Sequence, residues 1–239
     1  MDQLNYWAIA ERDIEIQNPI TDRKLRLLDD YCDIRDGLSV LDIGCGKAWL
    51  MRQWADKFAI EGVGVDVNAR FLEVARRKAP ARGRLTFHNM AAKGFPAGRE
   101  SYDIVLCLGA AFAIGEAPEA LEWMAAATRP GGTMVLGDMV LKHAPAVPKG
   151  DILPPDTLGM IGVMERHGAE VSATISASEA DFERYASHHR HATLTWARAN
   201  PDHPDHAEVL KKSREDWIHY QRTIRPMLGW TILVGRKKG

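Results

Sequence analysis

The sequence predicts an α/β fold, a doubly wound and mostly parallel sheet of seven strands with a helical insertion before the last strand. Short apolar runs that end in Gly, Asp or Asn alternate with amphipathic stretches of helical length. Runs such as 39–43 and 103–108 are apolar almost throughout, which is typical of parallel strands buried on both faces. A length of 239 residues is sufficient for one sizeable core.

Each element follows from this pattern in chain order. A helix over 21–31 precedes the sheet, with Thr21 or Asp22 as its N-cap. The segment 129–132, Arg-Pro-Gly-Gly, predicts a tight turn before the fifth strand. The strands are expected over 39–43, 62–66, 84–88, 103–108, 133–138, 170–176 and 228–235. The helices between them are expected over 48–58, 68–79, 117–128 and 156–167.

The chain is expected to form one domain, 1–239. No strand is evident in the insertion, where two helical stretches flank the breaker at 200–204. Ser178 and Asp181 resemble a capping box at its start. The expected parts are an N-terminal arm and helix at 1–30, a core at 31–177, the helical insertion at 178–226, and a last strand and tail at 227–239.

Composition excludes several classes of protein. Lys plus Arg number 31 against 32 Asp plus Glu, so no overall field favours nucleic acid or an acidic membrane. Cys32, Cys45 and Cys107 lack CxxC spacing, which favours a reducing, cytoplasmic compartment. The sequence contains neither a signal-peptide pattern nor 18 uninterrupted apolar residues, so neither export nor membrane spanning is expected.

The strongest motif follows the first strand, where Gly44-Cys45-Gly46 precedes a helix. The glycines allow a sharp turn and close approach of a ligand, and amide hydrogens at the helix start face that ligand. A dinucleotide fingerprint needs a third glycine at position 49, but the chain has Trp49 there, which argues against NAD. Asp42, two residues before Gly44, suits an ammonium or an ordered water and would repel a pyrophosphate.

A second acid, Asp66, ends the second strand 22 positions after Gly44 (66 minus 44). A carboxylate at this place typically accepts hydrogen bonds from both hydroxyls of a ribose. The structural alternative is that Asp66 caps the helix beginning near Asn68.

Taken in order, five segments resemble the class I S-adenosylmethionine-dependent methyltransferases: VLDIGCGKAWL, GVGVDVNARFLEVARRKA, LTFHNMAA, YDIVLCLGAAFAIG and TRPGGTMVLGD. The resemblance is strong over 18–139 and looser elsewhere. The tail segments WARANPDHPD and LGWTILVGR also look like a bacterial small-molecule branch of that family. It implies a Rossmann-like sheet with an antiparallel last strand, S-adenosylmethionine as methyl donor, S-adenosylhomocysteine as product, and a small-molecule acceptor.

The resemblance also implies a set of cofactor contacts. Asp42 would lie near the ammonium, Asp66 would hold the ribose, and Val67 would flank the adenine. Met90 stands where the family usually has an acid for the adenine amino group, which leaves the backbone of Met90 and Ala91 to serve there. The full expected set is Asp42, Gly44, Cys45, Gly46, Asp66, Val67, Met90, Ala91, Leu108 and Gly109.

The acceptor is expected near 109–115 and 138–143, because open parallel sheets bind ligands beyond the carboxyl ends of their strands. Methyl transfer is an in-line displacement that needs positioning and, for some acceptors, a base. Asp138 and His143 are the candidates for acceptor contact or proton removal, and the alternative role for both is hydrogen bonding within a loop. The fourth motif lacks the Asn/Asp-Pro-Pro-aromatic run used on nucleobases and on protein glutamine.

Aromatic side chains of the arm and the insertion are candidates for a substrate pocket, with ordinary packing as the alternative. His188 and His191 are spaced i, i+3, but no acid or cysteine of suitable spacing accompanies them, so no metal site is expected. The pocket candidates are Tyr6, Trp7, Phe112, Tyr185, Trp196 and Trp217.

Three alternatives stay open at this point. The chain binds S-adenosylmethionine without transferring its methyl group, or it is an NAD-dependent oxidoreductase, or it methylates RNA. The sequence leaves undetermined whether oxygen, nitrogen, sulfur or carbon accepts the methyl group, and it leaves the oligomeric state undetermined.

Overall fold

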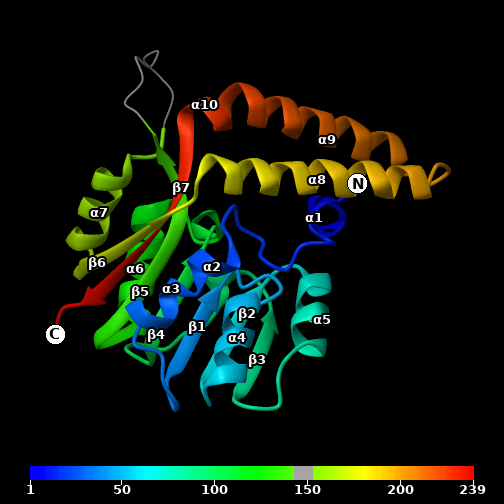
Figure 1. Cartoon of the computed structure of the whole chain (residues 1–239). Coiled ribbons are helices and arrows are strands. Elements are labelled where there is room, and N and C mark those ends of the chain that lie inside the picture. The colour runs from blue at the N-terminus through cyan, green and yellow to red at the C-terminus, as the bar shows by residue number, and fades with distance from the viewer. Residues whose placement is uncertain (143–152) are drawn as a thin grey trace.

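The computed structural model describes residues 1–142 and 153–239 (Figure 1). Their seven-stranded sheet has the order β3-β2-β1-β4-β5-β7-β6. The first five strands pair in parallel, whereas β7 runs antiparallel to both β5 and β6, so the predicted fold class is confirmed. The strands are β1 (Ser39–Ile43), β2 (Glu61–Asp66), β3 (Arg84–Asn89), β4 (Tyr102–Leu108), β5 (Thr128–Leu141), β6 (Ala169–Ser176) and β7 (Leu228–Lys237).

The chain order reverses between β1 and β4, which are neighbours in the sheet. In open parallel sheets, such a switch point opens a crevice beyond the carboxyl ends of the strands. The glycine loop that follows β1 and the segment that follows β4 therefore lie on the two sides of that crevice.

The helices follow the predicted pattern with one difference. The helix expected over 21–31 is two short helices, because Asp29 N bonds back to Arg26 O and the turn tightens there. Thr21 caps the first of them, as expected. The helices preceding the insertion are α1 (Gln3–Ala10), α2 (Asp22–Leu25), α3 (Leu27–Tyr31), α4 (Trp49–Lys57), α5 (Ala69–Arg77), α6 (Ala117–Ala127) and α7 (Thr157–Arg166), with 3-10 turns at Ala92–Gly94 and Ala111–Ala113.

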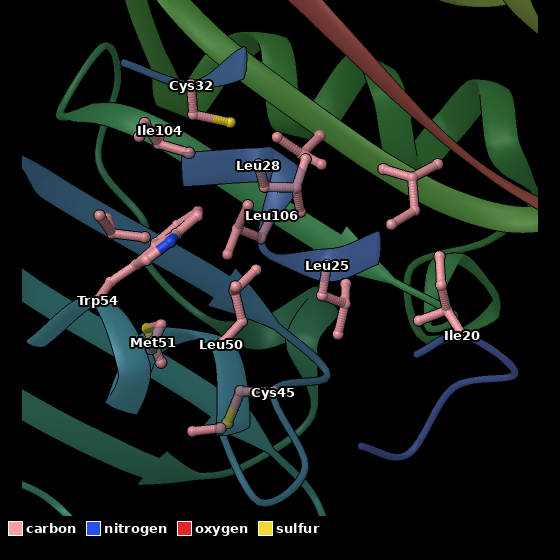
Figure 2. Close-up of a cluster of buried hydrophobic side chains, with 14 of the residues drawn as sticks. Ile20, Leu25, Leu28, Cys32, Cys45, Leu50, Met51, Trp54, Ile104 and Leu106 are labelled. Carbon is pink, nitrogen blue, oxygen red and sulfur yellow. The ribbon is translucent and has the colours of Figure 1, made fainter. Parts of the chain in front are cut away.

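The sheet separates two apolar clusters, and successive residues of its central strands alternate between them. Val40 of β1 joins the cluster beneath α2, α3 and α4, whereas Leu41 joins the one beneath α6 and α7. Figure 2 shows the first cluster, in which Trp54 of α4 is fully buried. Its indole Nε1 donates to Asp29 Oδ1 at 2.7 Å, so the polar atom of this large side chain is satisfied.

The predicted insertion is helical. Its helices are α8 (Glu179–Ala199), α9 (His206–His219), a π turn (Tyr220–Ile224) and α10 (Arg225–Met227). Ser178 and Asp181 form the expected capping box, each side chain accepting from the other residue's backbone N–H. In Figure 1, α8 and α9 run side by side across the end of the sheet towards which β1 points, with α1 next to α8. The insertion and the arm therefore lie over the crevice.

The Arg129–Gly132 turn lies within the bounds of β5 rather than before it. Tyr102 pairs with Thr128 and Ile104 with Thr133, so the residues between bulge out of the ladder. Gly131 supplies the positive φ of +73° that this turn needs.

Within residues 1–142 and 153–239, none of the helices combines the length and the apolar composition that crossing a bilayer requires.

Candidate functional site

The glycine loop closes β1 with backbone that only glycine tolerates well. Gly44 and Gly46 have φ values of +68° and +53°. A Cβ on Gly44 would overlap the side chain of Ala110, and one on Gly46 would overlap the amide of Gln17. The N–H groups of Gly44 and Cys45 donate to Val65 O at 2.8 and 3.1 Å, so the loop is tied to β2.

Asp66 fixes the same loop from the end of β2. Its Oδ2 accepts from Gly46 N at 2.8 Å and its Oδ1 from Asn68 N at 2.7 Å. The N-cap of α5 is Asn68, whose Oδ1 accepts from Arg70 N, so Asp66 is not the cap. A carboxylate offers about four acceptor positions, so each oxygen keeps one for a ligand. Burial raises the pKa of Asp66 despite the two backbone hydrogen bonds.

Asp42 contrasts with Asp66, because no hydrogen bond to its carboxylate is found among the described residues. The side chain is buried in the wall of the crevice. Burial, together with the nearby charge of Asp66, raises the pKa of Asp42 to about 8. A cation placed beside it would stabilise the ionised form, so this position favours a positively charged group.

A first cavity of about 600 Å³ opens between the glycine loop and the ends of β2 and β4. Ala91, the residue before the 3-10 turn at Ala92–Gly94, is not on its wall, although its neighbours Met90 and Ala92 are. The other members of the expected cofactor set line this cavity: Asp42, Gly44, Cys45, Gly46, Asp66, Val67, Met90, Leu108 and Gly109.

A second cavity of about 450 Å³ lies between the arm, the insertion and the ends of β5 and β7. Trp196 lies outside its lining, with its ring edge-on to His203. The reason is helical geometry: Trp196 is eleven positions beyond Tyr185, which is about 16 Å along α8. The other expected pocket residues line the cavity, namely Tyr6, Trp7, Phe112, Tyr185 and Trp217, together with Phe182, Tyr220 and Trp230.

The two cavities share a wall. Phe112 belongs to this wall and is 82% exposed, unusually high for a large apolar side chain. Gly109 is also in the wall, and a Cβ at this position would overlap the side chain of Asn18. The residues common to both cavities are Trp7, Gln17, Asn18, Gly109, Phe112 and Tyr185.

Of the two candidate catalytic residues, Asp138 lines the second cavity, and His143 lies outside the described residues. Asp138 Oδ1 accepts from the N–H of Met139 at 2.7 Å. Burial raises the pKa of Asp138, with a smaller contribution from the charge of Glu116.

Lys47 directly follows the glycine loop and was not among the predicted site residues. Its buried ammonium donates to the carbonyls of Glu11, Arg12 and Ile14 at 2.7, 3.1 and 2.6 Å. Its backbone N–H donates to Gln17 Oε1 at 2.6 Å. Desolvation lowers the pKa of Lys47. Lys47 thus fastens the arm to the glycine loop, beside both cavities. In the sequence, the only signal of this role is a lysine directly after the two glycines.

A second group of contacts joins the arm to α8; Tyr185 was a predicted pocket residue, but its link to Glu11 of the arm was not predicted. The hydroxyl of Tyr185 donates to Glu11 Oε1 at 2.7 Å and to Gln17 O at 3.1 Å. His189 Nε2 lies 3.3 Å from the same Glu11 oxygen. In the part of the chain that the structure describes, no cluster of three or more His, Cys, Asp or Glu side chains is placed to hold a metal ion.

Comparison with known proteins agrees with this geometry. The family model of a methyltransferase domain matches residues 40–132. Protein YjhP of Escherichia coli (strain K12) is 28% identical over 98% of both chains. The O-methyltransferase cnsE of Penicillium expansum is 28% identical over 59% of this chain, which spans about half (51%) of that protein.

A crystal structure of a SAM-dependent methyltransferase from Geobacter sulfurreducens, in complex with S-adenosyl-L-homocysteine, superposes with a TM-score of 0.88. It is 25% identical in sequence, and the match covers 98% of each chain. The matched domain contains the glycine loop, Asp66 and β4, and the overall likeness extends over the arm and the insertion. The domain match and the shared fold therefore identify a SAM-dependent methyltransferase that is similar to the class I enzymes.

Proposed function

We propose that the chain transfers the methyl group of S-adenosylmethionine to a small molecule bound in the second cavity. The observation that carries the proposal is the wall shared by the two cavities at Gly109, Phe112 and Tyr185. A donor in the first cavity and an acceptor in the second would meet there, and holding both in line is the main requirement of a displacement at a methyl group.

In this proposal, different residues of the first cavity bind the methionine part, the ribose and the adenine of the cofactor. Asp42 pairs with the ammonium of the methionine part, which compensates a buried carboxylate that otherwise has no hydrogen bond among the described residues. Asp66 accepts from the ribose hydroxyls with the acceptor positions left after its two backbone hydrogen bonds. Val67, which is 46% exposed, and Met90 flank the adenine.

The second cavity selects a flat, largely apolar acceptor, because aromatic rings from the arm and the insertion form much of its wall. Oxygen is the proposed methyl acceptor, in line with the name of the matched O-methyltransferase from Penicillium expansum. A net charge of −1 supports a small molecule over nucleic acid. The three buried, unpaired cysteines support a cytoplasmic location.

Two measurements in sequence test the proposal. S-adenosylmethionine at 100 times its dissociation constant should raise the free energy of unfolding by about 2.7 kcal/mol, and NAD should leave it unchanged. Small aromatic molecules that carry a hydroxyl, amino or thiol group should then give S-adenosylhomocysteine in amounts equal to the methylated product.

Stabilisation by NAD alone would contradict the cofactor assignment. Stabilisation by S-adenosylmethionine with no product from any acceptor would favour the alternative, a protein that binds the cofactor without transferring its methyl group.

A further inference from the structure

We propose that His189, positioned by Glu11, accepts the proton of the methyl acceptor, and that the acceptor is an aromatic molecule bearing a hydroxyl group. The inference rests on the proposed function and deepens it, because it concerns the chemistry of the second cavity. Neither residue belongs to the motifs that identify the family, and they are 178 positions apart (189 minus 11).

His189 lies on α8, one turn after Tyr185, and lines the second cavity. The Tyr185 ring packs against it with centroids 4.2 Å apart, and Trp7 meets it edge-on at 5.6 Å. Its Nε2 atom is buried and has no hydrogen bond among the described residues, although Glu11 Oε1 is only 3.3 Å away. A buried imidazole nitrogen beside a carboxylate is ready to gain a charge-assisted partner once the ring is protonated.

Glu11 is held in place independently of His189. Its Oε1 accepts from the hydroxyl of Tyr185, its Oε2 accepts from Gln17 Nε2, and its backbone carbonyl accepts from the ammonium of Lys47. The carboxylate is 8% exposed, so little water screens it. Glu11 is therefore a positioning residue that orients the imidazole and would stabilise its protonated form.

Two other groups near the cavities are poorer proton acceptors. The hydroxyl of Tyr185 donates a hydrogen bond to Glu11, and burial raises the pKa of this phenol well above its ordinary value, so it keeps its own proton and does not act as a base. At Asp138 the hydrogen bond from the N–H of Met139 favours the ionised carboxylate and so opposes proton uptake, although burial raises the pKa overall. No hydrogen bond between Nδ1 of His189 and a described residue is found, and His189 lines the second cavity.

In the proposed step, one bond forms and one breaks at the methyl carbon. The acceptor oxygen forms a bond to the methyl carbon while the bond from that carbon to the sulfonium sulfur breaks. The electron pair of the broken bond stays on sulfur, giving the neutral thioether of S-adenosylhomocysteine. The hydroxyl proton passes to Nδ1 of His189, the imidazolium pairs with Glu11 through Nε2, and the proton later leaves to solvent.

The test compares phenols of different acidity, because an acceptor that is already ionised needs no base. The variant His189→Gln should lower kcat for 4-methoxyphenol at least 100-fold, the lower end of what a general base contributes. For the far more acidic 4-nitrophenol, the same variant should lose less than about tenfold. Glu11→Gln should follow the same trend with a smaller loss. His188→Gln, at an exposed position on the same helix, is the matched control and should match the wild type on both phenols.

Calorimetry with S-adenosylmethionine separates the possible failures. If His189→Gln fails to fold or to bind the cofactor, His189→Asn takes its place in the same comparison. Equal losses on the two phenols would overturn the role of His189 as base. A wild type that binds the cofactor and methylates neither phenol would overturn the acceptor class, whereas a wild type that binds no cofactor would contradict the proposed function itself.

Discussion

The two cavities of this methyltransferase are built in different ways. Short segments at the ends of β1, β2, β3 and β4 contribute most of the first cavity, and its shape depends on backbone conformation at Gly44 and Gly46. The second cavity is formed by side chains of the arm, the sheet and the insertion, which are far apart in the sequence. The first cavity, the proposed cofactor site, is therefore set by local backbone requirements, whereas the second, the proposed acceptor site, is set by tertiary packing.

This contrast explains why only one of the two sites carries a recognisable pattern. Positive φ values and close contacts require glycine at two fixed places, so the loop leaves a short motif in the sequence. Many different side chains can form an aromatic wall, and aromatic residues that pack in an ordinary core look the same in the sequence. Substitutions that act on one cavity, on the other, or on both therefore test whether the two cavities are built independently.

The largest effect is expected at Lys47, because it joins the two regions. The variant Lys47→Met leaves three buried carbonyls of the arm without their charged donor, so it should lower the free energy of unfolding by about 3 kcal/mol. Urea unfolding measures the change. The control is Lys78→Met, which loses a half-exposed ion pair to Glu15 in the same arm and should cost at most about 1 kcal/mol. Equal losses in the two variants would show that the buried contacts do not fasten the arm.

A smaller effect, confined to the first cavity, is expected at Asp66. The variant Asp66→Ala should weaken S-adenosylmethionine binding at least tenfold, about 1.4 kcal/mol, because it removes the ribose acceptor and the partner of Gly46 N–H. Calorimetry should find unchanged affinity in Asp36→Asn, at an exposed position, and in Trp217→Ala, which changes the wall of the second cavity and not that of the first. An affinity unchanged by Asp66→Ala would count against the cofactor site.

The smallest effect is a proton linkage at Asp42. With a pKa of about 8, this carboxyl is mostly protonated at pH 7 in the ligand-free protein, and an ammonium beside it favours the ionised form. Cofactor binding at pH 7 should therefore release nearly one proton, so the binding enthalpy should differ between phosphate and Tris buffers. Asp42→Asn should remove most of that difference, and a wild type without buffer dependence would contradict the pairing.

The raised pKa of Asp42 also makes the stability of the ligand-free protein depend on pH. The folded pKa of Asp42 lies above its ordinary value of 3.8, so the folded state holds this proton more tightly than the unfolded state does. The contribution of Asp42 to stability is therefore complete at low pH and is lost as the pH rises towards 8. Unfolding of the ligand-free protein across this range should show a steeper decline for the wild type than for Asp42→Asn.

The sequence predicted the regular elements well, because buried parallel strands and amphipathic helices leave periodic patterns. It did not predict that the helix over 21–31 is divided at Arg26, because that division depends on one local hydrogen bond, from Asp29 N to Arg26 O. Trp196 is aromatic like the residues that line the second cavity, and only its position farther along α8 places it outside that lining. Glu11 and His189 come together only when the arm and the insertion meet over the sheet, so no spacing in the sequence pairs them.

The central claim is that the donor binds in the glycine-loop cavity with its methyl group facing the second cavity. A crystal structure with bound S-adenosylmethionine tests it most directly. We expect the ammonium beside Asp42 and the sulfonium methyl at the shared wall near Gly109 and Tyr185. A cofactor bound elsewhere, or a methyl group directed away from the second cavity, would contradict it.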